Sequence, residues 1–360
     1  PPPPPPPPPP PTPRDSIRRQ RQMCISDRLG LGRLGVERPE VASVDLNPVI
    51  LHGARPVAVD ALVEIAETPA EPRPAPPPLR DEEIIERFRP LFDPRGIVVA
   101  GVSSHPGKFG FTAYHNLLRF GYRGELFPVN RDGVEILGHA TLREVSEVPE
   151  GRADLVFVCT PNRANIELLR ACAQRGVRAA FIASGGYGEA GAKGKVLERE
   201  LVEVANQLGM LVAGPNGQGV ISTGCSMCAQ IVAPNPPAGH ITLVSQSGNL
   251  VSSFLNYAVL SGVGVSKAIS SGNSAQTGLA DYIEYFGADP ETRVALAYLE
   301  GVSDGARFIE TARAVTARKP LVIVKGGVAS EGKRAAASHT GAMASDDRVF
   351  DGISRQLGVI

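Results

Sequence analysis

The chain contains 360 residues, and this length predicts two or three domains, each large enough to bury a core. Its 37 basic and 37 acidic residues give a formal net charge of zero, so the charge predicts neither a nucleic acid nor an anionic membrane surface as a partner. Any phosphate must therefore be bound by local positive charge. No apolar run approaches the roughly 20 residues that span a bilayer, and the N-terminal residues lack the apolar region of a signal peptide.

The cysteines are irregularly spaced, which favours a reduced cytoplasmic protein over a disulfide framework. They are Cys24, Cys159, Cys172, Cys225 and Cys228. The last two form a C-x-x-C pair, but there is no second pair and no histidine close by in the sequence. We therefore interpret this pair as incidental and predict no zinc site from it.

Residues 1–39 are unlike a folded domain. They begin with an uninterrupted proline tract from Pro1 to Pro11, and a basic stretch from Arg14 to Arg21 follows. Such a tract forms polyproline II and cannot build a core. We expect a disordered leader, and a ligand for an SH3-like or WW-like domain is the alternative.

Residues 40–66 predict two short strands around a turn. The alternation of apolar and polar side chains places Asp45, Asn47 and, across the hairpin, Asp60 on one face. Carboxylate and amide oxygens gathered in this way suit a hard cation such as Mg²⁺, although an ordinary polar sheet face explains the spacing better. Residues 67–85, with a run rich in Pro, Ala and charge, are interpreted as an interdomain linker.

From residue 97 onward the pattern becomes strand, glycine-rich loop, helix. The first such loop contains Gly101, Ser103, Lys108 and Gly110. A glycine-rich turn at a helix start offers backbone N–H groups and a positive dipole end to a phosphate, and a lysine adds a full charge. The loop is of the Rossmann kind but is not G-x-G-x-x-G, and the next strand ends in Asn130, where a dinucleotide site usually has an acid. The sequence therefore favours the phosphates of a cofactor other than NAD.

Three further apolar strands each end in a loop of small or polar residues. These loops contain Thr160 and Pro161, then Ser184 and Gly185, then Asn216. Near-continuous apolar strands are typical of parallel strands that are covered on both faces. Their carboxyl ends line one crevice of a doubly wound sheet, and we assign residues 86–233 to this α/β domain.

A second α/β domain is predicted over residues 238–360. Its first strand runs into Ser245, Gln246, Ser247 and Gly248, and a helix follows from about residue 250 to about residue 260. Hydroxyl and N–H groups at a helix start form an anion site, and the alternative is plain helix capping by one of the two serines, which needs no ligand. A later strand, residues 294–299, leads to Glu300.

The stretch from Leu321 to Ala344 combines an apolar strand with a small-residue loop that carries His339. Neutral imidazole is a competent nucleophile near pH 7, because its unperturbed pKa of roughly 6.5 leaves most of it deprotonated. Because glycine-rich sites precede it, we interpret His339 as a phosphoryl carrier rather than as a solvated loop histidine. Glu300 either orients the imidazole ring or pairs with a surface arginine, and the residues alone leave both open.

Residues 91–360 resemble the nucleoside-diphosphate-forming (NDP-forming) acyl-CoA synthetases, the ADP-forming acetate–CoA ligase group related to succinyl-CoA synthetase. The resemblance implies an α/β protein with a Rossmann-like CoA-binding domain followed by a flavodoxin-like domain of the succinyl-CoA-synthetase type. Several motifs carry it in the right order: Gly101 to Gly110, Ser184 to Glu189, Gly214 to Asn216, Ser245 to Asn249, Ser271 to Asn273, Tyr298 to Gly301 and Ser338 to Ala342.

This resemblance implies specific roles for the residues singled out above. His339 would be the phosphorylated histidine, Glu300 its orienting acid, and Ser245 to Gly248 the phosphate-binding helix start. Coenzyme A would be bound through Gly101, Ser103, Lys108, Gly110, Asn130, Thr160, Pro161, Ser184, Gly185 and Asn216. Asp45, Asn47 and Asp60 resemble positions in the last strands of the family's ATP-grasp region that hold Mg²⁺, so the resemblance favours the metal interpretation for them.

The implied activity converts acyl-CoA, ADP and phosphate into a carboxylic acid, CoA and ATP through an acyl phosphate and a phosphohistidine, with acetate or another small acid as the product. The remainder of the ATP-grasp region, which binds ATP or ADP, would be supplied by another domain or subunit, and an oligomer is expected. The alternative is a non-catalytic module that senses CoA or acyl-CoA, as in relatives fused to a protein acetyltransferase. The presence of both His339 and Glu300 favours the ligase.

Overall fold

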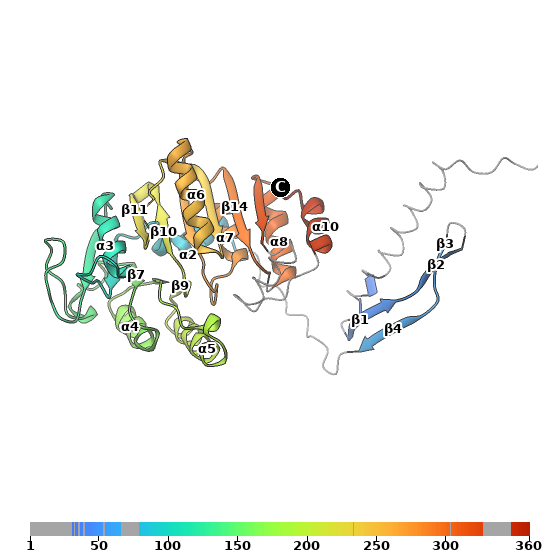
Figure 1. Cartoon of the computed structure of the whole chain (residues 1–360), viewed down its shortest axis with the longest axis horizontal. Helices are drawn as coiled ribbons and strands as arrows, with labels where there is room; N and C mark the ends of the chain where they lie inside the picture. The colour runs from blue at the N-terminus through green and yellow to red at the C-terminus, as the bar shows by residue number, and fades with distance from the viewer. Residues whose placement is uncertain are drawn as a thin grey trace, which may run out of the picture. The chain divides into compact units, whose positions relative to one another are not determined.

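The computed structural model describes residues 31, 33–34, 37–38, 40–52, 55–65, 79–232, 234–302, 304–326 and 347–360. The chain divides into two compact units, Pro1–Pro78 and Leu79–Ile360 (Figure 1). His339 and residues 1–30 lie outside the described residues. None of the helices in the described ranges is long and apolar enough to cross a membrane.

The first unit contains the predicted hairpin. Strand β1 (Val41–Leu46) pairs antiparallel with β4 (Ala61–Ile65), and β2 (Val49–His52) pairs antiparallel with β3 (Arg55–Ala58). Leu46 lies opposite Ala61 and Val49 opposite Ala58, so the register places Asn47 opposite Asp60. The two strands predicted from the alternation of side chains are therefore confirmed.

The second unit begins with a parallel sheet of five strands in the order β6-β5-β7-β8-β9. Its strands carry few polar residues and are mostly buried, as expected of parallel strands that are covered on both faces. Their bounds are β5 Gly96–Ala100, β6 Glu125–Val129, β7 Leu155–Val158, β8 Ala179–Ile182 and β9 Leu211–Ala213.

Helices cover both faces of this sheet (Figure 1). They are α2 Asp81–Phe92, α3 Phe109–Arg119, α4 Asn162–Gln174 and α5 Ala192–Gln207, with short 3₁₀ helices η1 Val145–Glu147 and η2 Gly188–Ala190. Alternate strand residues face opposite ways: Val99 packs in one core with residues of α2 and α3, whereas Val98 packs in a second core with residues of α4 and α5.

The second sheet has six strands in the order β11-β10-β13-β12-β14-β15. The four strands β13, β12, β14 and β15 are parallel, and the edge pair β10 and β11 is antiparallel. Their bounds are β10 Gly219–Ser222, β11 Met227–Gln230, β12 Ala238–Ser245, β13 Val265–Ser270, β14 Val294–Leu299 and β15 Leu321–Lys325, and the 3₁₀ helix η3 is Thr223–Cys225.

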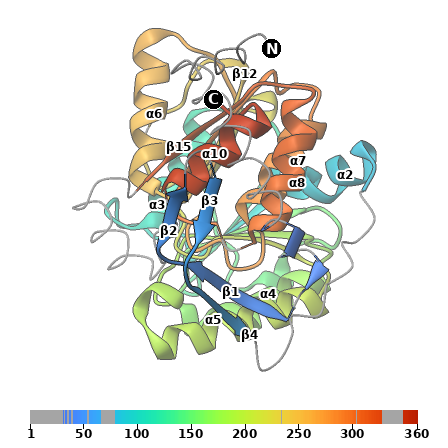
Figure 2. The same cartoon turned by 90° about the vertical axis from the view of Figure 1, so that its right-hand side faces the viewer.

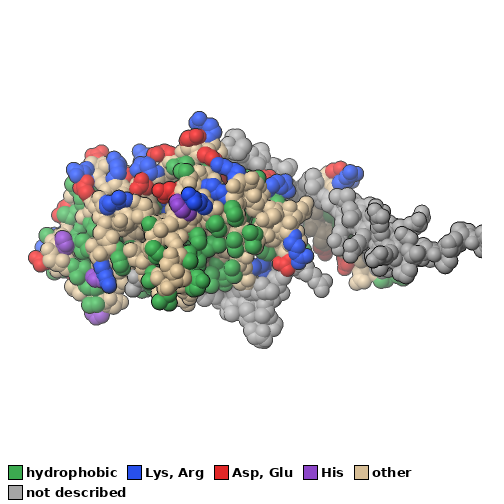
Figure 3. Space-filling model, turned by 90° about the horizontal axis from the view of Figure 1, so that it is seen from above, with side chains coloured by type: hydrophobic (Ala, Val, Ile, Leu, Met, Phe, Trp, Pro, Cys, Tyr) green, Lys and Arg blue, Asp and Glu red, His purple; other side chains and the backbone are tan. Residues whose placement is uncertain are grey.

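Figure 2 shows α6 on one side of this second sheet and α7 and α8 on the other. The helices are α6 Gly248–Ser261, α7 Leu279–Ala288, α8 Gly305–Thr316 and α10 Asp347–Leu357. Parallel strands alternate with helices on both faces, which is the predicted doubly wound, flavodoxin-like arrangement. Figure 3 shows acidic and basic side chains interspersed on the visible face of the larger unit, in keeping with the balanced charge.

The structure differs from the predicted ranges in two places. Helix α2 begins at Asp81, inside the predicted linker, and its Ile84 and Phe88 are buried in the core of the second unit. Strands β10 and β11 lie inside the range assigned to the first α/β domain, yet they hydrogen-bond to the second sheet. One hydrophobic core consequently runs through both sheets, because residues of β5 and of β14 belong to the same cluster.

Candidate functional site

The loop after β5 brings the start of α3 against the end of the strand. A Cβ atom at Gly110 would overlap the carbonyl oxygen of Gly101, so only glycine permits this approach. Lys108 is the N-cap residue of α3, and no side chain caps the helix start. The exposed Lys108 ammonium and the first N–H groups of α3 can therefore face the same anion.

Side chains within this loop hold its shape. Ser103 Oγ accepts a hydrogen bond from the backbone N–H of His105 at 3.1 Å, and the Asn130 amide donates to the carbonyl of Val102 at 2.7 Å. Asn130 Oδ1 also accepts from the N–H of Asp132 at 2.9 Å. Asn130 therefore joins the ends of β5 and β6, and it brings no negative charge toward a phosphate.

Asn165, a residue that the sequence did not single out, links the next two loops of the sheet. It is fully buried on α4; it accepts a hydrogen bond from Thr160 Oγ1 at 2.8 Å and donates to Ser184 Oγ at 2.9 Å. Its amide also donates to the hydroxyl of Tyr187 at 2.8 Å. One buried side chain thus fixes two predicted CoA-binding loops to each other.

The carboxyl-end loops of the two sheets interlock. The N–H of Asn216 donates to the Ser184 carbonyl at 3.1 Å, and the N–H of Asn273 donates to the Pro215 carbonyl at 2.9 Å. Gly272 has φ +54°, and a Cβ atom there would overlap the Pro215 carbonyl oxygen. The loops after β9 and β13 are therefore packed backbone against backbone.

Glu189 and Asn273 strengthen this junction. Asn273 Nδ2 donates to Glu189 Oε2 at 2.5 Å and to Glu198 Oε2 at 2.7 Å, and the N–H of Gly186 donates to Glu189 Oε1 at 2.5 Å. Burial alone would raise the pKa of Glu189, but hydrogen bonds from Asn273 and the backbone outweigh it and hold the pKa below its usual value. Ser184-Gly-Gly-Tyr-Gly-Glu189 and Ser271-Gly-Asn273 were visible as motifs, but their mutual contact was not.

The predicted phosphate motif lies at the start of α6. Ser247 is the N-cap residue, and its side chain makes no capping hydrogen bond. Ser245 Oγ instead accepts from the N–H of Ser247 at 3.1 Å and donates to the Ser247 carbonyl at 2.7 Å, within the turn. Helix capping by these serines therefore does not explain the motif, and the first N–H groups of α6 remain available to an anion.

Glu300 lies beside this helix start, because β12 and β14 are neighbouring parallel strands. Gln246, which follows β12, accepts hydrogen bonds through Oε1 from the N–H of Glu300 at 2.6 Å and from the N–H of Gly301 at 3.3 Å. Glu300 Oε2 is buried and has no hydrogen-bond partner among the described residues. The structure thus brings Ser245, Gln246, Ser247 and Gly248 together with Glu300.

The first unit carries the three predicted Mg²⁺ ligands. Asp45, Asn47 and Asp60 are exposed, and the pairing register puts them on one face of the hairpin. Asp60 Oδ1 accepts from the N–H of Ala61 at 2.8 Å. Two carboxylates and an amide are suitable oxygen ligands for Mg²⁺, which commonly keeps several waters. Within the described ranges no three His, Cys, Asp or Glu side chains gather closely enough to hold a metal.

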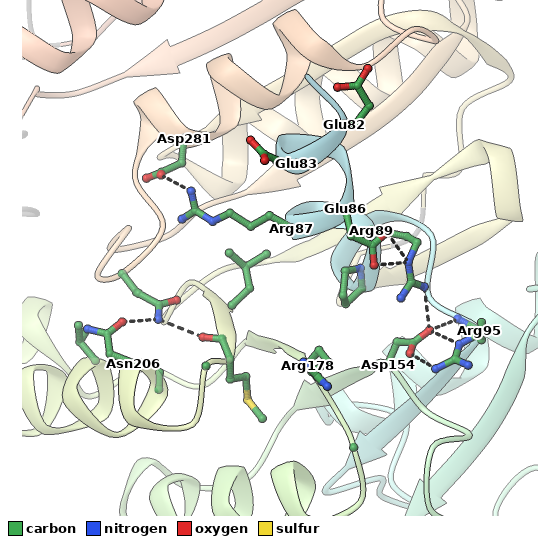
Figure 4. A pocket seen from close by; sticks show the side chains of 18 of the residues that line it. Glu82, Glu83, Glu86, Arg87, Arg89, Arg95, Asp154, Arg178, Asn206 and Asp281 are labelled. Carbon is green, nitrogen blue, oxygen red and sulfur yellow. Dashed lines mark hydrogen bonds and ion pairs between the residues drawn. The ribbon is translucent and has the colours of Figure 1, made fainter. Parts of the chain in front are cut away.

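A cavity of about 1150 Å³ opens at the opposite edge of the five-stranded sheet, where the strands begin (Figure 4). Its charged side chains pair with one another: Asp154 with Arg95 at 2.6 Å and with Arg89 at 3.3 Å, and Asp281 with Arg87 at 3.3 Å. None of the predicted site residues lines it. The cavity is therefore separate from the carboxyl-end crevice.

The four cysteines in the described part of the chain are free thiols. Burial raises the pKa of Cys159 and Cys172 to about 12. Burial also raises the pKa of Cys228 to about 12 against a hydrogen bond from Gln230, and it raises the pKa of Cys225. These thiols are protonated near neutral pH and are poor nucleophiles.

Comparisons with known proteins agree with the two-domain arrangement. The family model described as CoA binding domain matches residues 95–223, and the one described as succinyl-CoA ligase like flavodoxin domain matches residues 238–360. The ADP-forming acetate–CoA ligase I subunit alpha of Pyrococcus furiosus is 38% identical over 274 residues, covering 75% of this chain and 59% of that protein. The ADP-forming acetate–CoA ligase I of Archaeoglobus fulgidus is 39% identical over 270 residues, covering 75% of this chain and 39% of that protein.

A solved structure gives the same result. The Ca. Korarchaeum cryptofilum dinucleotide forming acetyl-coenzyme A synthetase 1, in complex with phosphate and ADP, matches with a TM-score of 0.71 at 33% identity, covering 76% of this chain and 59% of that one. The chain thus spans about 59% of the length of the Pyrococcus and Korarchaeum relatives. With the CoA-binding domain and the succinyl-CoA-ligase-like domain in this order, the chain belongs to the NDP-forming acyl-CoA synthetase family.

Proposed function

We propose that this chain is the CoA-binding and phosphohistidine part of an acid–CoA ligase that interconverts acyl-CoA, ADP and phosphate with a carboxylic acid, CoA and ATP. The relatives named above are acetate–CoA ligases or an acetyl-CoA synthetase, which supports acetate or another small acid as the product. CoA is bound across the carboxyl ends of β5 to β9, where Lys108 and the start of α3 meet its phosphates.

The reaction proceeds in two transfers on this chain. A phosphate oxygen attacks the thioester carbonyl, the C–S bond breaks, and CoA leaves with its sulfur protonated. A ring nitrogen of His339 then attacks the phosphorus atom of the resulting acyl phosphate. The P–O bond to the acyl group breaks, and the acyl group leaves as the carboxylate. The start of α6 stabilises the negative charge of the phosphoryl group during the transfer, because the N–H groups and the dipole of this helix are oriented toward the phosphoryl group beforehand.

The observation that carries this proposal is the buried Oε2 atom of Glu300, which has no hydrogen-bond partner among the described residues. A buried carboxylate oxygen without a partner is costly, and this one lies one strand away from an uncapped helix start. We propose that an imidazole N–H of His339, which lies outside the described residues, supplies the missing donor. Such a contact fixes the tautomer and leaves the other ring nitrogen free to attack phosphorus.

The nucleotide half of the reaction requires groups outside this part of the enzyme. An ATP-grasp domain or subunit supplied elsewhere holds ADP or ATP, and Asp45, Asn47 and Asp60 contribute to the Mg²⁺ site that neutralises its phosphates. The subunit name of the Pyrococcus relative supports an oligomer of different subunits. The free cysteines of the described residues support a reducing compartment, and we assign the protein to the cytoplasm.

Incubation of the purified chain with acetyl-CoA and radiolabelled phosphate tests the phosphohistidine half-reaction. We expect acid-labile, base-stable label that maps to His339. The variant His339→Ala should take up no label while it still binds CoA, because the CoA loops lie on the other sheet. Label on the His339→Ala variant, or a chain that binds no CoA, would contradict the proposal.

A panel of other acyl-CoA thioesters separates a wrong acyl group from an absent activity. If acetyl-CoA gives no label but another thioester does, the proposed half-reaction is supported and the thioester identifies the carboxylic acid that the enzyme forms. If CoA binds and no thioester in the panel gives label, the chain is a CoA-sensing module instead.

A further inference from the structure

We propose that Gln246 is a positioning residue that acts through Glu300, so that its side chain fixes the direction of the Glu300 carboxylate. This inference rests on the proposed function, in which Glu300 orients His339. The resemblance implied that Gln246 binds phosphate, together with the serines beside it. The geometry points to a different role for the side-chain oxygen of Gln246, Oε1.

Three hydrogen bonds tie Gln246 to the end of β14. Its Oε1 accepts from the N–H groups of Glu300 at 2.6 Å and Gly301 at 3.3 Å, and its own backbone N–H donates to the Tyr298 carbonyl at 3.2 Å. Both side-chain contacts come from N–H donors, so the accepting atom must be the amide oxygen and not the nitrogen. The Gln246 side chain thus provides the hydrogen-bond acceptor for the N–H groups of Glu300 and Gly301, which follow the last residue of β14 and have no strand partner there among the described residues.

Glu300 depends on this backbone support. Its Oε2 is buried without a hydrogen-bond partner in the described part of the chain, so no described side chain holds that oxygen in position. The hydrogen bonds between Gln246 and the main chain at Glu300 and Gly301 then fix the point from which the carboxylate side chain extends. A misplacement of about 1 Å in a catalytic constellation can lower a rate by about 100-fold.

Phosphate binding by Gln246 and positioning of Glu300 by Gln246 predict different kinetics of histidine labelling. If its amide nitrogen bound the incoming phosphate, its loss would raise the phosphate concentration needed for half-maximal labelling. If it positions Glu300, its loss lowers the maximal rate of labelling and leaves that concentration unchanged. Loss of the groups that orient metal ligands typically costs about 10- to 100-fold in activity, and we expect an effect of the same order for a group that positions a carboxylate.

A double-mutant cycle tests whether Gln246 acts through Glu300. We compare Gln246→Met, which keeps the length of the side chain but has no oxygen, with Glu300→Gln and with the double variant. Each single change should lower the maximal rate of histidine labelling by about 10- to 100-fold. In the Glu300→Gln background, Gln246→Met should lower it by less than about threefold, because the group it positions is already gone.

Gln218→Met is the matched control. The side chain of Gln218 also lies at the start of α6, where its amide donates to Asn249 Oδ1 at 3.3 Å and accepts from Ser252 Oγ at 2.7 Å, and neither of these hydrogen bonds involves Glu300. The effect of Gln218→Met on the maximal rate of labelling should be the same in the unaltered protein and in the Glu300→Gln variant. Additive effects of Gln246→Met and Glu300→Gln, or a raised phosphate requirement in Gln246→Met, would overturn the inference while leaving the proposed function intact.

Amide hydrogen exchange gives a readout that needs no activity. In Gln246→Met the N–H groups of Glu300 and Gly301 lose their acceptor and should exchange faster, whereas Gln246→Glu keeps an accepting oxygen and should retain the protection. Unchanged exchange in Gln246→Met would refute the contact itself. If the unaltered chain takes up no label from any thioester, the proposed function fails, and this inference fails with it.

Discussion

Gly110 decides how closely α3 approaches the end of β5. The helix start lies so near the Gly101 carbonyl that there is no space for a side chain. This contact brings the N–H groups of α3 and the Lys108 ammonium to the point where a phosphate can meet both. The size of one residue therefore controls the geometry of the proposed anion site.

Gly110→Ala should destabilise the protein by about 1–3 kcal/mol, because a backbone shift must relieve the overlap, and it should weaken CoA binding. Thermal unfolding and a CoA titration measure the two effects. Gly107→Ala is the control in the same loop, since a Cβ atom there meets only the exposed His105 ring, at 3.1 Å. Equal losses of stability and CoA affinity in both variants would contradict the special role of Gly110, because any added side-chain volume in the loop would then have the same effect.

The candidate site residues were predictable where an apolar strand ends in a polar loop, as with Ser245 at the end of β12 and Ser184 after β8. Asn165 was not, because a polar residue on a helix gives no sign of whether it is buried. Its three partners come from two loops, the one after β7 and the one after β8, and only the folded chain brings these loops together. The Glu189–Asn273 contact was not predictable for the same reason, since Glu189 follows a strand of the first sheet and Asn273 follows a strand of the second.

Among the elements, β5 and β7 are joined at their starts by Asp154. This carboxylate is only 1% exposed, and it accepts hydrogen bonds from the backbone N–H of Arg95 at 2.8 Å and from the Arg95 guanidinium at 2.6 Å. Burial alone would raise the pKa of Asp154, but the contacts with Arg95 and the charge of Arg89 outweigh burial and hold the pKa below its usual value.

Asp154→Asn should lower the free energy of unfolding at pH 7 by about 1.5–3 kcal/mol, the usual worth of hydrogen bonds to a charged group. Because the folded-state pKa lies below the unfolded value of about 3.9, the carboxylate stabilises the protein above that pH. This stability is lost as the pH falls through the folded pKa. Unfolding curves of both proteins from pH 7 to pH 3 should converge in acid, and parallel curves would contradict the assignment.

Strand and helix positions in the second unit followed from the sequence wherever an apolar run was bounded by glycine or polar loops, as with β7, β12 and β14. The membership of β10 and β11 in the second sheet did not follow. These two strands were not predicted at all, and pairing partners far along the chain, such as β13, leave no local signal. The start of α2 was also missed, because its charged first turn continues the composition of the proline-rich linker.

On the scale of the whole molecule, the two α/β domains of Leu79–Ile360 share one of their hydrophobic clusters. Side chains from α2, β5, β14 and α8 belong to one cluster. The edge pair β10 and β11 extends the second sheet with chain from the first domain's range. The two domains are therefore distinct in sequence but continuous in packing.

Removal of residues 1–78 should leave the melting temperature and the CoA affinity unchanged, because Leu79–Ile360 is a compact unit with its own core. A fragment of residues 86–233 should not fold, because it lacks the start of α2 and the strand β13 on which β10 pairs. Circular dichroism melts and a CoA titration of both fragments provide the measurement. A stable, CoA-binding 86–233 fragment would show that the shared core is dispensable.

The burial of the thiols has a practical consequence for measuring the reaction. A chromogenic disulfide reagent reacts with thiolates, and burial raises the pKa of all four cysteines of the described residues, so they form thiolates only at high pH. In the folded protein these four thiols should therefore add little colour to that of free CoA. Release of CoA by phosphate can therefore be followed continuously by absorbance, and slow additional colour would signal unfolding of the protein.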